Sequence, residues 1–327
     1  MHDLIEQTFY PHLDNPILHA GNDASLFTLA GPSLIAVSTD SHVVSPLFFP
    51  GGDIGRLAVC GTVNDVAMMG AKPIYLTAGF ILEEGLDLSI LETILTSMRI
   101  AADEAGVKIV AGDTKVVQKG RADGLYINTA GIGIVYEDIK VGGNLAQPGD
   151  AVILSGTIGD HGIAVLNARG DLGFEANIES DVAPLNHLIG KIVRYAQERN
   201  GANKLHVFRD PTRGGLATSL NEIARQSHLC ITINEEQLII NPTVNAACEI
   251  LGLDPVYIAN EGKFLAIVEP SLAKGILEIL NNDPLGKDAR LIGEVVNEPA
   301  GRVLMRTIIG STRVLDIPSG ELLPRIC

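Results

Sequence analysis

The sequence predicts an α+β protein built from two domains. Helical patterns and strand-like runs alternate irregularly, and two strand-like runs, at 107–111 and 125–135, follow each other with no helix between them. A doubly wound sheet needs a helix after almost every strand, so this order argues against a simple βαβ repeat. The length of 327 residues is typical of two domains that each bury a core.

The elements of the first half follow from composition and spacing. Apolar residues recur at helical spacing over 54–69, and a second helical pattern over 88–105 ends at Gly106. Runs rich in β-forming residues predict strands at 34–39, 74–82, 107–111 and 125–135.

Turn residues cluster at 142–143 and 148–150, just before a fresh apolar strand at 151–154. We therefore expect a domain boundary near residue 145, which divides the chain into 1–145 and 146–318. Residues 319–327 show no clear period and are expected to form a flexible tail. The second half is predicted to contain helices at 183–199, 214–228, 242–251 and 271–281, and strands at 205–208, 264–268 and 290–296.

Charge and cysteine usage narrow the class of protein. The chain has 24 Lys plus Arg against 39 Asp plus Glu, a formal net charge of -15, which argues against a nucleic-acid partner. No run approaches the roughly 20 apolar residues that span a bilayer, and the start lacks the pattern of a signal peptide. The four cysteines form no CxxC pair, which favours a reducing, cytoplasmic setting.

Carboxylates recur beside small or hydroxyl residues where apolar strands end. Asp40, Asp113, Asp160 and Asp210 follow this pattern, and Asn64-Asp65 adds a polar pair inside an apolar helix. One such Asp is normally a turn former or a helix cap. Together they suit Mg²⁺, a hard cation that binds through carboxylates and substrate phosphates, and so they suit Mg-ATP.

Groups that bind phosphate are also present. The segment 210–215, Asp-Pro-Thr-Arg-Gly-Gly, leads into a helical pattern whose N-terminal amides can face an anion, and Lys115 and Lys263 add charge. Taken alone, the segment fits equally well a loop with a solvated Arg213. His161, in a glycine-rich turn, can touch phosphate or simply be solvated. No GxxxxGK[ST], GxGxxG, GxSxG or HExxH motif occurs, which removes support for P-loop, Rossmann, hydrolase-elbow and zincin sites.

The cysteine at the end of the chain differs from the other three. Cys60, Cys230 and Cys248 lie in apolar surroundings, as buried structural thiols do. Cys327 ends a tail punctuated by Pro and Gly, where a thiol adds little to a core and risks oxidation. Nine extended residues reach about 30 Å, which predicts an arm that delivers the thiol to a cleft.

These segments together resemble the HypE family of hydrogenase-maturation proteins, within the group typified by aminoimidazole ribonucleotide synthetase and selenophosphate synthetase. The resemblance runs nearly end to end, and the terminal Pro-Arg-Ile-Cys marks the HypE family. Its carriers are Ser38-Thr39-Asp40-Ser41, Pro50-Gly51-Gly52, Val63-Asn64-Asp65-Val66-Ala67, Gly112-Asp113-Thr114-Lys115, Ser155-Gly156-Thr157-Ile158-Gly159-Asp160-His161-Gly162, Arg209-Asp210-Pro211-Thr212-Arg213-Gly214-Gly215, Asn260-Glu261-Gly262-Lys263 and Pro324-Arg325-Ile326-Cys327.

The resemblance implies a homodimer whose N-terminal domains pair through their sheets, with ATP in a cleft near that interface. It implies that the terminal cysteine receives a carbamoyl group from the carbamoyltransferase HypF. ATP then drives dehydration of the thiocarbamate to a thiocyanate, and the cyano group passes to iron on a HypC-HypD complex. This agrees with the residues, because an amide oxygen is a poor leaving group until it is phosphorylated.

Site residues are carried over by motif. The resemblance implies Asp40, Asp65 and Asp113 as ligands of Mg²⁺ with ATP. Cys327 and Lys115 are assigned to catalysis, with Glu261 as the candidate proton acceptor. The residues expected around the nucleotide are Asp40, Asn64, Asp65, Asp113, Thr114, Asp160, His161, Asp210, Thr212, Arg213 and Gly214.

Two other interpretations stay open from the residues. One is a carrier that holds a modified Cys327 for partners while its nucleotide site is inactive. The other keeps the fold but is a small-molecule kinase or ribonucleotide synthetase in which Cys327 is incidental. The dehydratase is favoured because the tail and the carboxylates occur in one chain.

Overall fold

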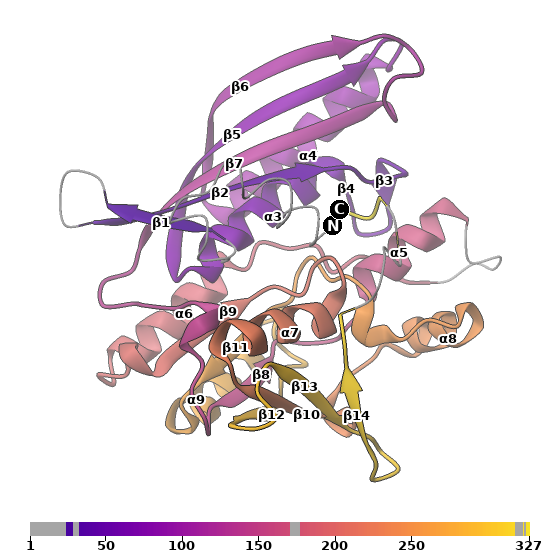
Figure 1. The fold of residues 1–327 in the computed structure, drawn as a ribbon. Coiled ribbons are helices and arrows are strands. Elements are labelled where there is room, and N and C mark those ends of the chain that lie inside the picture. The colour runs from indigo at the N-terminus through magenta and orange to yellow at the C-terminus, as the bar shows by residue number, and fades with distance from the viewer. Residues whose placement is uncertain (1–23, 29–32, 171–176, 318–322, 324) are drawn as a thin grey trace, which may run out of the picture.

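The computed structural model describes residues 24–28, 33–170, 177–317, 323 and 325–327. These residues build one large sheet in each half of the chain, and Figure 1 shows the first sheet above the second. Both sheets mix parallel and antiparallel pairs. The predicted α+β class is therefore confirmed.

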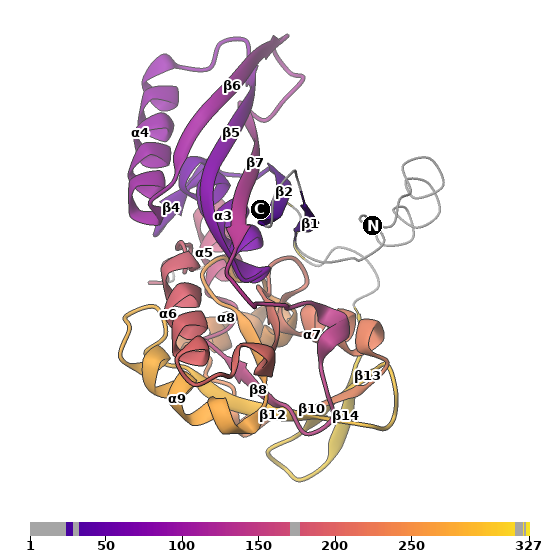
Figure 2. The same ribbon diagram turned by 90° about the vertical axis from the view of Figure 1, so that its left-hand side faces the viewer.

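The first sheet has five strands in the order β1-β2-β7-β5-β6. Only β5 and β6 pair in parallel. Helices α3 (Ile54–Met68) and α4 (Leu88–Ala105) lie on one face of the sheet, as Figures 1 and 2 show from two sides. The strands are β1 (Ser25–Thr28), β2 (Leu34–His42), β5 (Ala71–Glu83), β6 (Lys108–Val117) and β7 (Leu125–Val135), with a short ribbon of β3 (Phe48–Phe49) and β4 (Gly52–Asp53) before α3.

Helix α3 is buried on almost all sides and forms the centre of the first domain. Asp53 begins it, because its carboxylate accepts hydrogen bonds from two N–H groups of the first turn. The helix lies close on β7 because Gly131 and Gly133 have no side chains there. A Cβ at these positions would come within 2.8 Å of Thr62 and 2.5 Å of Val66, respectively.

The second sheet has seven strands in the order β14-β13-β10-β12-β8-β11-β9. Helices α6 and α9 pack on one face and α7 on the other, so successive residues of β8 alternate between two cores. The strands are β8 (Ala151–Leu154), β9 (Leu205–Arg209), β10 (Cys230–Asn234), β11 (Leu265–Val268), β12 (Arg290–Val296), β13 (Arg302–Arg306) and β14 (Thr312–Leu315). The helices are α5 (Asp160–Arg169), α6 (Asn186–Gln197), α7 (Gly215–Ser227), α8 (Pro242–Leu251) and α9 (Pro270–Asn281).

One apolar cluster joins the two halves. It contains residues of α3 and α4 from the first half and of α5 and α8 from the second. Leu323 and Ile326, near the C-terminus, are buried in the same cluster. The end of the chain therefore lies at the junction of the halves, and none of the described helices is long and apolar enough to cross a bilayer.

Most predicted elements are present. The helices predicted at 54–69, 88–105, 214–228 and 242–251 are observed within a residue or so of these bounds. The interpretation of the segment around His161 as a turn was wrong, because α5 begins at Asp160. This helix is buried from Asp160 to Leu166 and therefore shows no polar face in the sequence. The boundary near residue 145 stays a prediction.

The contact between α3 and β7 can be tested with Gly133→Ala. The added methyl group would overlap Val66 and the Lys72 carbonyl, so we expect a loss of about 1–3 kcal/mol in the free energy of unfolding. Gly79→Ala on neighbouring β5 is the matched control, because its Cβ would meet nothing closer than 3.8 Å. Equal stabilities of the two variants in urea unfolding would contradict this packing.

Candidate active site

The last three residues of the chain are docked between the two halves. Ile326 pairs with Val44 in an antiparallel bridge, and the Val43 N–H donates to the Cys327 carbonyl at 2.9 Å. Ile326 is 3% exposed. The sequence predicted a tail that adds little to a core, but the side chain of its penultimate residue is part of one.

The loop 209–215 places Arg213 in contact with the thiol of Cys327. Gly214 and Gly215 have φ values of +80° and +61°, the left-handed region that glycine adopts readily. A side chain at Gly215 would also meet the backbone of the loop before β11 at 2.6 Å. This tight turn places Arg213 so that its Nη2 donates to Cys327 Sγ at 3.6 Å. Thr212 lies on the same loop and is partly buried.

The loop before β11 lies against loop 209–215, since the Asn260 N–H donates to the Pro211 carbonyl at 3.0 Å. Asp181 holds this loop. Its carboxylate accepts hydrogen bonds from the Asn260 side chain and the Glu261 N–H, both at 3.1 Å, and from Lys263 Nζ at 3.2 Å. The backbone of Glu261 is thereby fixed at the junction of the two halves.

The Glu261 side chain is 4% exposed, and its Oε1 has no hydrogen-bond partner among the described residues. Burial raises the pKa of Glu261 well above its ordinary value, and Asp210, Asp40 and Asp181 raise it further while Arg213 opposes them. The carboxyl group therefore holds its proton to a higher pH than an exposed glutamate does, and in its protonated form it can donate. The predicted residues that the fold brings into electrostatic reach of one another are Asp40, Asp210, Arg213, Glu261 and Cys327.

The docked thiol is protonated. Burial raises the pKa of Cys327 to about 12, Glu261 acts in the same direction, and Arg213 acts against them. The thiolate is the nucleophilic form of cysteine, so the docked sulfur is a weak nucleophile.

Two of the predicted metal ligands lie on the helix-covered face of the first sheet. Ser38 on β2 donates to Asp65 on α3 at 2.6 Å. The Asp40 carboxylate lies beside Gly61, about one helical turn before Asp65, so both carboxylates lie between β2 and α3. This oxygen donor pair fits a hard cation that also binds phosphate.

The predicted site residues of β6, Asp113 and Lys115, do not lie beside Asp40 and Asp65 within one chain. Asp113 is in register with Gly79, Asn128 and Ser41, whose row faces away from α3, and its carboxylate pairs with Lys115 on that open face. Three strand spacings separate β6 from β2, roughly 14 Å. Thr114 lies between Asp113 and Lys115 on β6. In the described part of the chain, no three His, Cys, Asp or Glu side chains form a metal cluster.

Asn64 binds protein groups. Its amide donates to the Ala183 carbonyl at 3.1 Å and accepts from the Leu185 N–H at 2.8 Å, so it ties α3 to the segment before α6. Asp160 accepts a hydrogen bond from the Thr157 hydroxyl. Burial raises the pKa of Asp160 to about 6, and its Oδ1 has no partner among the described residues.

His161 is fully buried, and its Nε2 donates to the Ile326 carbonyl at 2.5 Å. The expectation of a solvated loop histidine is therefore wrong, because the first turn of α5 packs under the docked tail.

Two residues near the site were not predicted from the sequence. Asp181 lies in an irregular stretch without a motif, so only its contacts reveal its importance. His42 is 1% exposed, and its Nε2 lies 3.4 Å from Asp40 Oδ2. Burial lowers the pKa of His42, against the charge of Asp40. The alternation of β2 was the available signal, because it places His42 on the face of Ser38 and Asp40.

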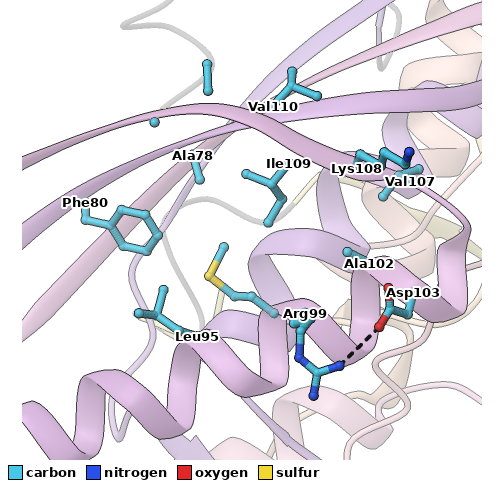
Figure 3. A pocket seen from close by; sticks show the side chains of 13 residues that line it. Ala78, Phe80, Leu95, Arg99, Ala102, Asp103, Val107, Lys108, Ile109 and Val110 are labelled. Carbon is cyan, nitrogen blue, oxygen red and sulfur yellow. Dashed lines mark hydrogen bonds and ion pairs between the residues drawn. The ribbon is translucent and has the colours of Figure 1, made fainter.

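A groove of about 660 Å³ lies away from the thiol, between β6 and α4. Figure 3 shows Phe80, Leu95 and Ile109 facing one another in it, with the Arg99 and Asp103 ion pair on its α4 side. Its lining is mainly apolar, so it does not resemble a phosphate site.

Sequence models place the chain in a known family. The AIR synthase related protein family matches it twice, with the N-terminal domain over residues 21–135 and the C-terminal domain over residues 147–306. The chain therefore belongs to the AIR synthase related proteins.

The carbamoyl dehydratase HypE of Cupriavidus necator is 51% identical over 99% of this chain and 91% of its own length. The structure of a HypE-HypF complex is similar with 50% identity and a TM-score of 0.90, covering 96% of this chain and 99% of that chain. The structure of HypE in complex with ATP is 49% identical to this chain with a TM-score of 0.85, and the match covers 100% of this chain and 96% of that chain. Within the larger family, the chain is a member of the HypE carbamoyl dehydratases, enzymes of hydrogenase maturation.

The role of Asp181 can be tested with Asp181→Asn. This change leaves the Lys263 ammonium, whose side chain is only 12% exposed, without its counter-charge, so we expect a loss of about 3–5 kcal/mol in the free energy of unfolding. Asp103→Asn breaks an exposed ion pair instead and should cost less than about 1 kcal/mol.

The destabilisation caused by Asp181→Asn should depend on pH. Burial alone would raise the pKa of Asp181, but Lys263, His161 and hydrogen bonds from Glu261 and Asn260 lower it overall. The stabilisation is therefore complete above the unfolded-state pKa and declines as pH falls through the depressed folded-state pKa. The gap in stability between wild type and variant should narrow in acid; a constant gap would contradict the ion pair.

The docked thiol should also be visible in alkylation kinetics. With a pKa raised to about 12, Cys327 should react slowly with iodoacetamide at pH 8, and its rate should keep rising beyond pH 9. Because docking favours the protonated thiol, docking is full below the pKa of the free thiol and weakens as pH rises toward 12. The free peptide 319–327 is the control, and equal rates for peptide and protein would exclude the docked state.

Proposed function

We propose that this chain is an ATP-dependent carbamoyl dehydratase that acts on its own Cys327. The substrate group is an S-carbamoyl thioester on Cys327, and the product is a thiocyanate that supplies cyanide for the iron of [NiFe]-hydrogenase. The observation that carries the proposal is the docking of Cys327 Sγ against Arg213, beside Glu261 and Asp40. The HypE structure solved with ATP supports ATP as the second substrate.

The reaction balances without a redox step. The carbamoyl oxygen attacks the γ-phosphorus of ATP, the bond to the β-phosphate breaks, and ADP leaves. The carbamoyl C–O bond then breaks, phosphate leaves with the oxygen, and the nitrogen loses two protons to give S–C≡N. Phosphorylation converts the oxygen into a leaving group, which is the difficult part of dehydrating an amide.

The chain's own residues supply positions and charges for these steps. Arg213, which contacts the sulfur, is placed to neutralise charge on the transferred phosphoryl group. Asp40 and Asp65 would hold Mg²⁺, which would supply positive charge to neutralise the phosphates of ATP. A cation beside Asp40 would also lower the raised pKa of Glu261, so that this carboxylate could take a proton from the carbamoyl nitrogen.

The tail must leave the site to be loaded. The docked thiol is protonated and therefore a weak nucleophile, so carbamoylation is expected on the undocked tail. Burying Ile326 stabilises docking by roughly 1.5–3 kcal/mol, whereas ordering each residue costs about 1–2 kcal/mol. The hydrogen bonds of residues 325–327, at about 1 kcal/mol each, add to this gain and favour the docked state by a modest margin. The docked state therefore predominates, and the arm leaves it transiently to be loaded.

Partners follow from the relatives and from the surface. The HypE-HypF complex supports HypF as the carbamoyl donor, and we extend the proposal to a HypC-HypD complex as the acceptor in the cytoplasm. A homodimer is supported by the open face of the first sheet, where Tyr75, Ile81, Ile132 and Ile134 are 39–45% exposed. Asp113 and Lys115 lie on this face, so pairing of two sheets would place them at the interface.

The proposal is tested on the C-terminal peptide of the intact protein. Cyanate adds to the Cys327 thiol to give the S-carbamoyl form, and Mg-ATP should then remove about 18 Da, the mass of water. Asp65→Asn should slow this loss at least tenfold, because it removes one of two paired carboxylates, whereas Asp103→Asn on the exposed face of α4 should not. An unchanged mass in the wild type would leave the chain as a carrier of the modified thiol.

A further inference from the structure

The terminal tripeptide is held by its backbone as well as by the Ile326 side chain. Ser45 N–H and Arg169 Nη2 both bind the Arg325 carbonyl, at 3.1 and 3.0 Å. The two carbonyls that follow accept from His161 and from the Val43 N–H. A backbone oxygen of each of residues 325–327 therefore has a partner, and the partners come from the segment just after β2 and from α5.

The hydrogen bonds around His161 define its tautomer. A carbonyl can only accept, so Nε2 carries the proton that goes to Ile326. Nδ1 then accepts from the Ser180 hydroxyl at 2.8 Å, while Ser180 Oγ accepts from the Val182 N–H at 3.1 Å. Phe49 packs edge-on against the imidazole ring, with ring centroids 5.4 Å apart. The ring is thus held in one orientation before the tail arrives.

The short segment 180–182, which contains Ser180, also positions Glu261. Ser180 orients His161, and the next residue, Asp181, holds the Glu261 N–H. The Ser180 N–H in turn donates to the Pro50 carbonyl of the first half at 2.8 Å. Residues 180–182 therefore help to fix both the docked tail, through His161, and Glu261, and so they help to fix the distance between the Cys327 sulfur and the Glu261 carboxyl group.

We propose that His161 is a positioning residue that holds the Ile326 carbonyl and so places the Cys327 sulfur opposite Glu261, rather than a ligand of the nucleotide. The sequence had assigned His161 to the nucleotide site. The proposal rests on the proposed function only for its effect on dehydration, because the hold on the tail is a property of the protein alone. It also explains the penultimate Ile326, whose buried side chain fixes the register of the tail.

The test compares His161→Phe with His161→Gln. Phe fills the volume but has no donor, while the Gln amide can reach the position of Nε2 and donate to the carbonyl. Loss of one hydrogen bond should shift the docking equilibrium, so Cys327 in His161→Phe should be alkylated up to roughly tenfold faster at pH 8. His161→Gln should restore slow alkylation to within about threefold of wild type.

ATP affinity separates the two roles of His161. Positioning predicts that His161→Phe binds ATP as the wild type does but dehydrates S-carbamoyl Cys327 at least several-fold more slowly in a single turnover. His187→Phe is the matched control, because His187 Nε2 also donates to a backbone carbonyl, Glu104, at 2.8 Å, but on the exposed side of α6. This control should change neither alkylation nor dehydration.

Every outcome bears on the proposal. Wild-type alkylation kinetics in His161→Phe, or weaker ATP binding with an unchanged tail, would overturn it, as would a His161→Gln variant that behaves like His161→Phe. If His161→Phe does not fold, Ser180→Ala provides the second test, since it removes the hydroxyl that orients His161 and should also speed the alkylation of Cys327, whereas wild-type kinetics would count against the proposal. If the wild type loses no water, the proposed function fails, and alkylation still decides the role of His161.

Discussion

The buried carboxylate of Asp181 is the interaction on which the site depends. It binds the Asn260 side chain, the Glu261 N–H and the Lys263 ammonium, and Gly262 between them has no room for a Cβ, which would lie 1.7 Å from the Asp181 carbonyl. A buried charge is costly unless it is paired and hydrogen-bonded, and here both conditions are met. The loop that carries Glu261 therefore has one position, set by a residue from outside it.

The charges around the thiol have a clear chemical consequence. Asp40, Asp210 and Asp181 lie near a buried Glu261, and Arg213 is the cation that contacts the sulfur. These neighbouring carboxylates and burial raise the pKa of Glu261, while Arg213 opposes them, so Glu261 holds its proton more tightly than an exposed glutamate does. The same surroundings keep the docked thiol protonated and protect the sulfur from reacting with other electrophiles.

The architecture makes the junction of the two halves the place where the tail can dock. Helices α3 and α4 from one half and α5 and α8 from the other share one apolar cluster, and the end of the chain completes it. The backbone of the tail pairs with the segment just after β2 in an isolated antiparallel bridge at Val44. Docking thus uses a backbone bridge for direction and the apolar cluster for register.

The sequence by itself determined the elements and the chemical groups of this protein. Apolar spacing, helix caps and turn residues are local signals, so they predicted α3, α4, α7 and α8 closely, and the motifs predicted Asp40, Asp210, Arg213, Glu261 and Cys327, which the fold brings together. Only the tertiary structure decided that Asp113 and Lys115 lie on the opposite face of the sheet, that Asp181 holds the loop of Glu261, and that His161 binds the tail. These facts depend on contacts between residues distant in the chain, and such contacts leave no periodicity in the sequence.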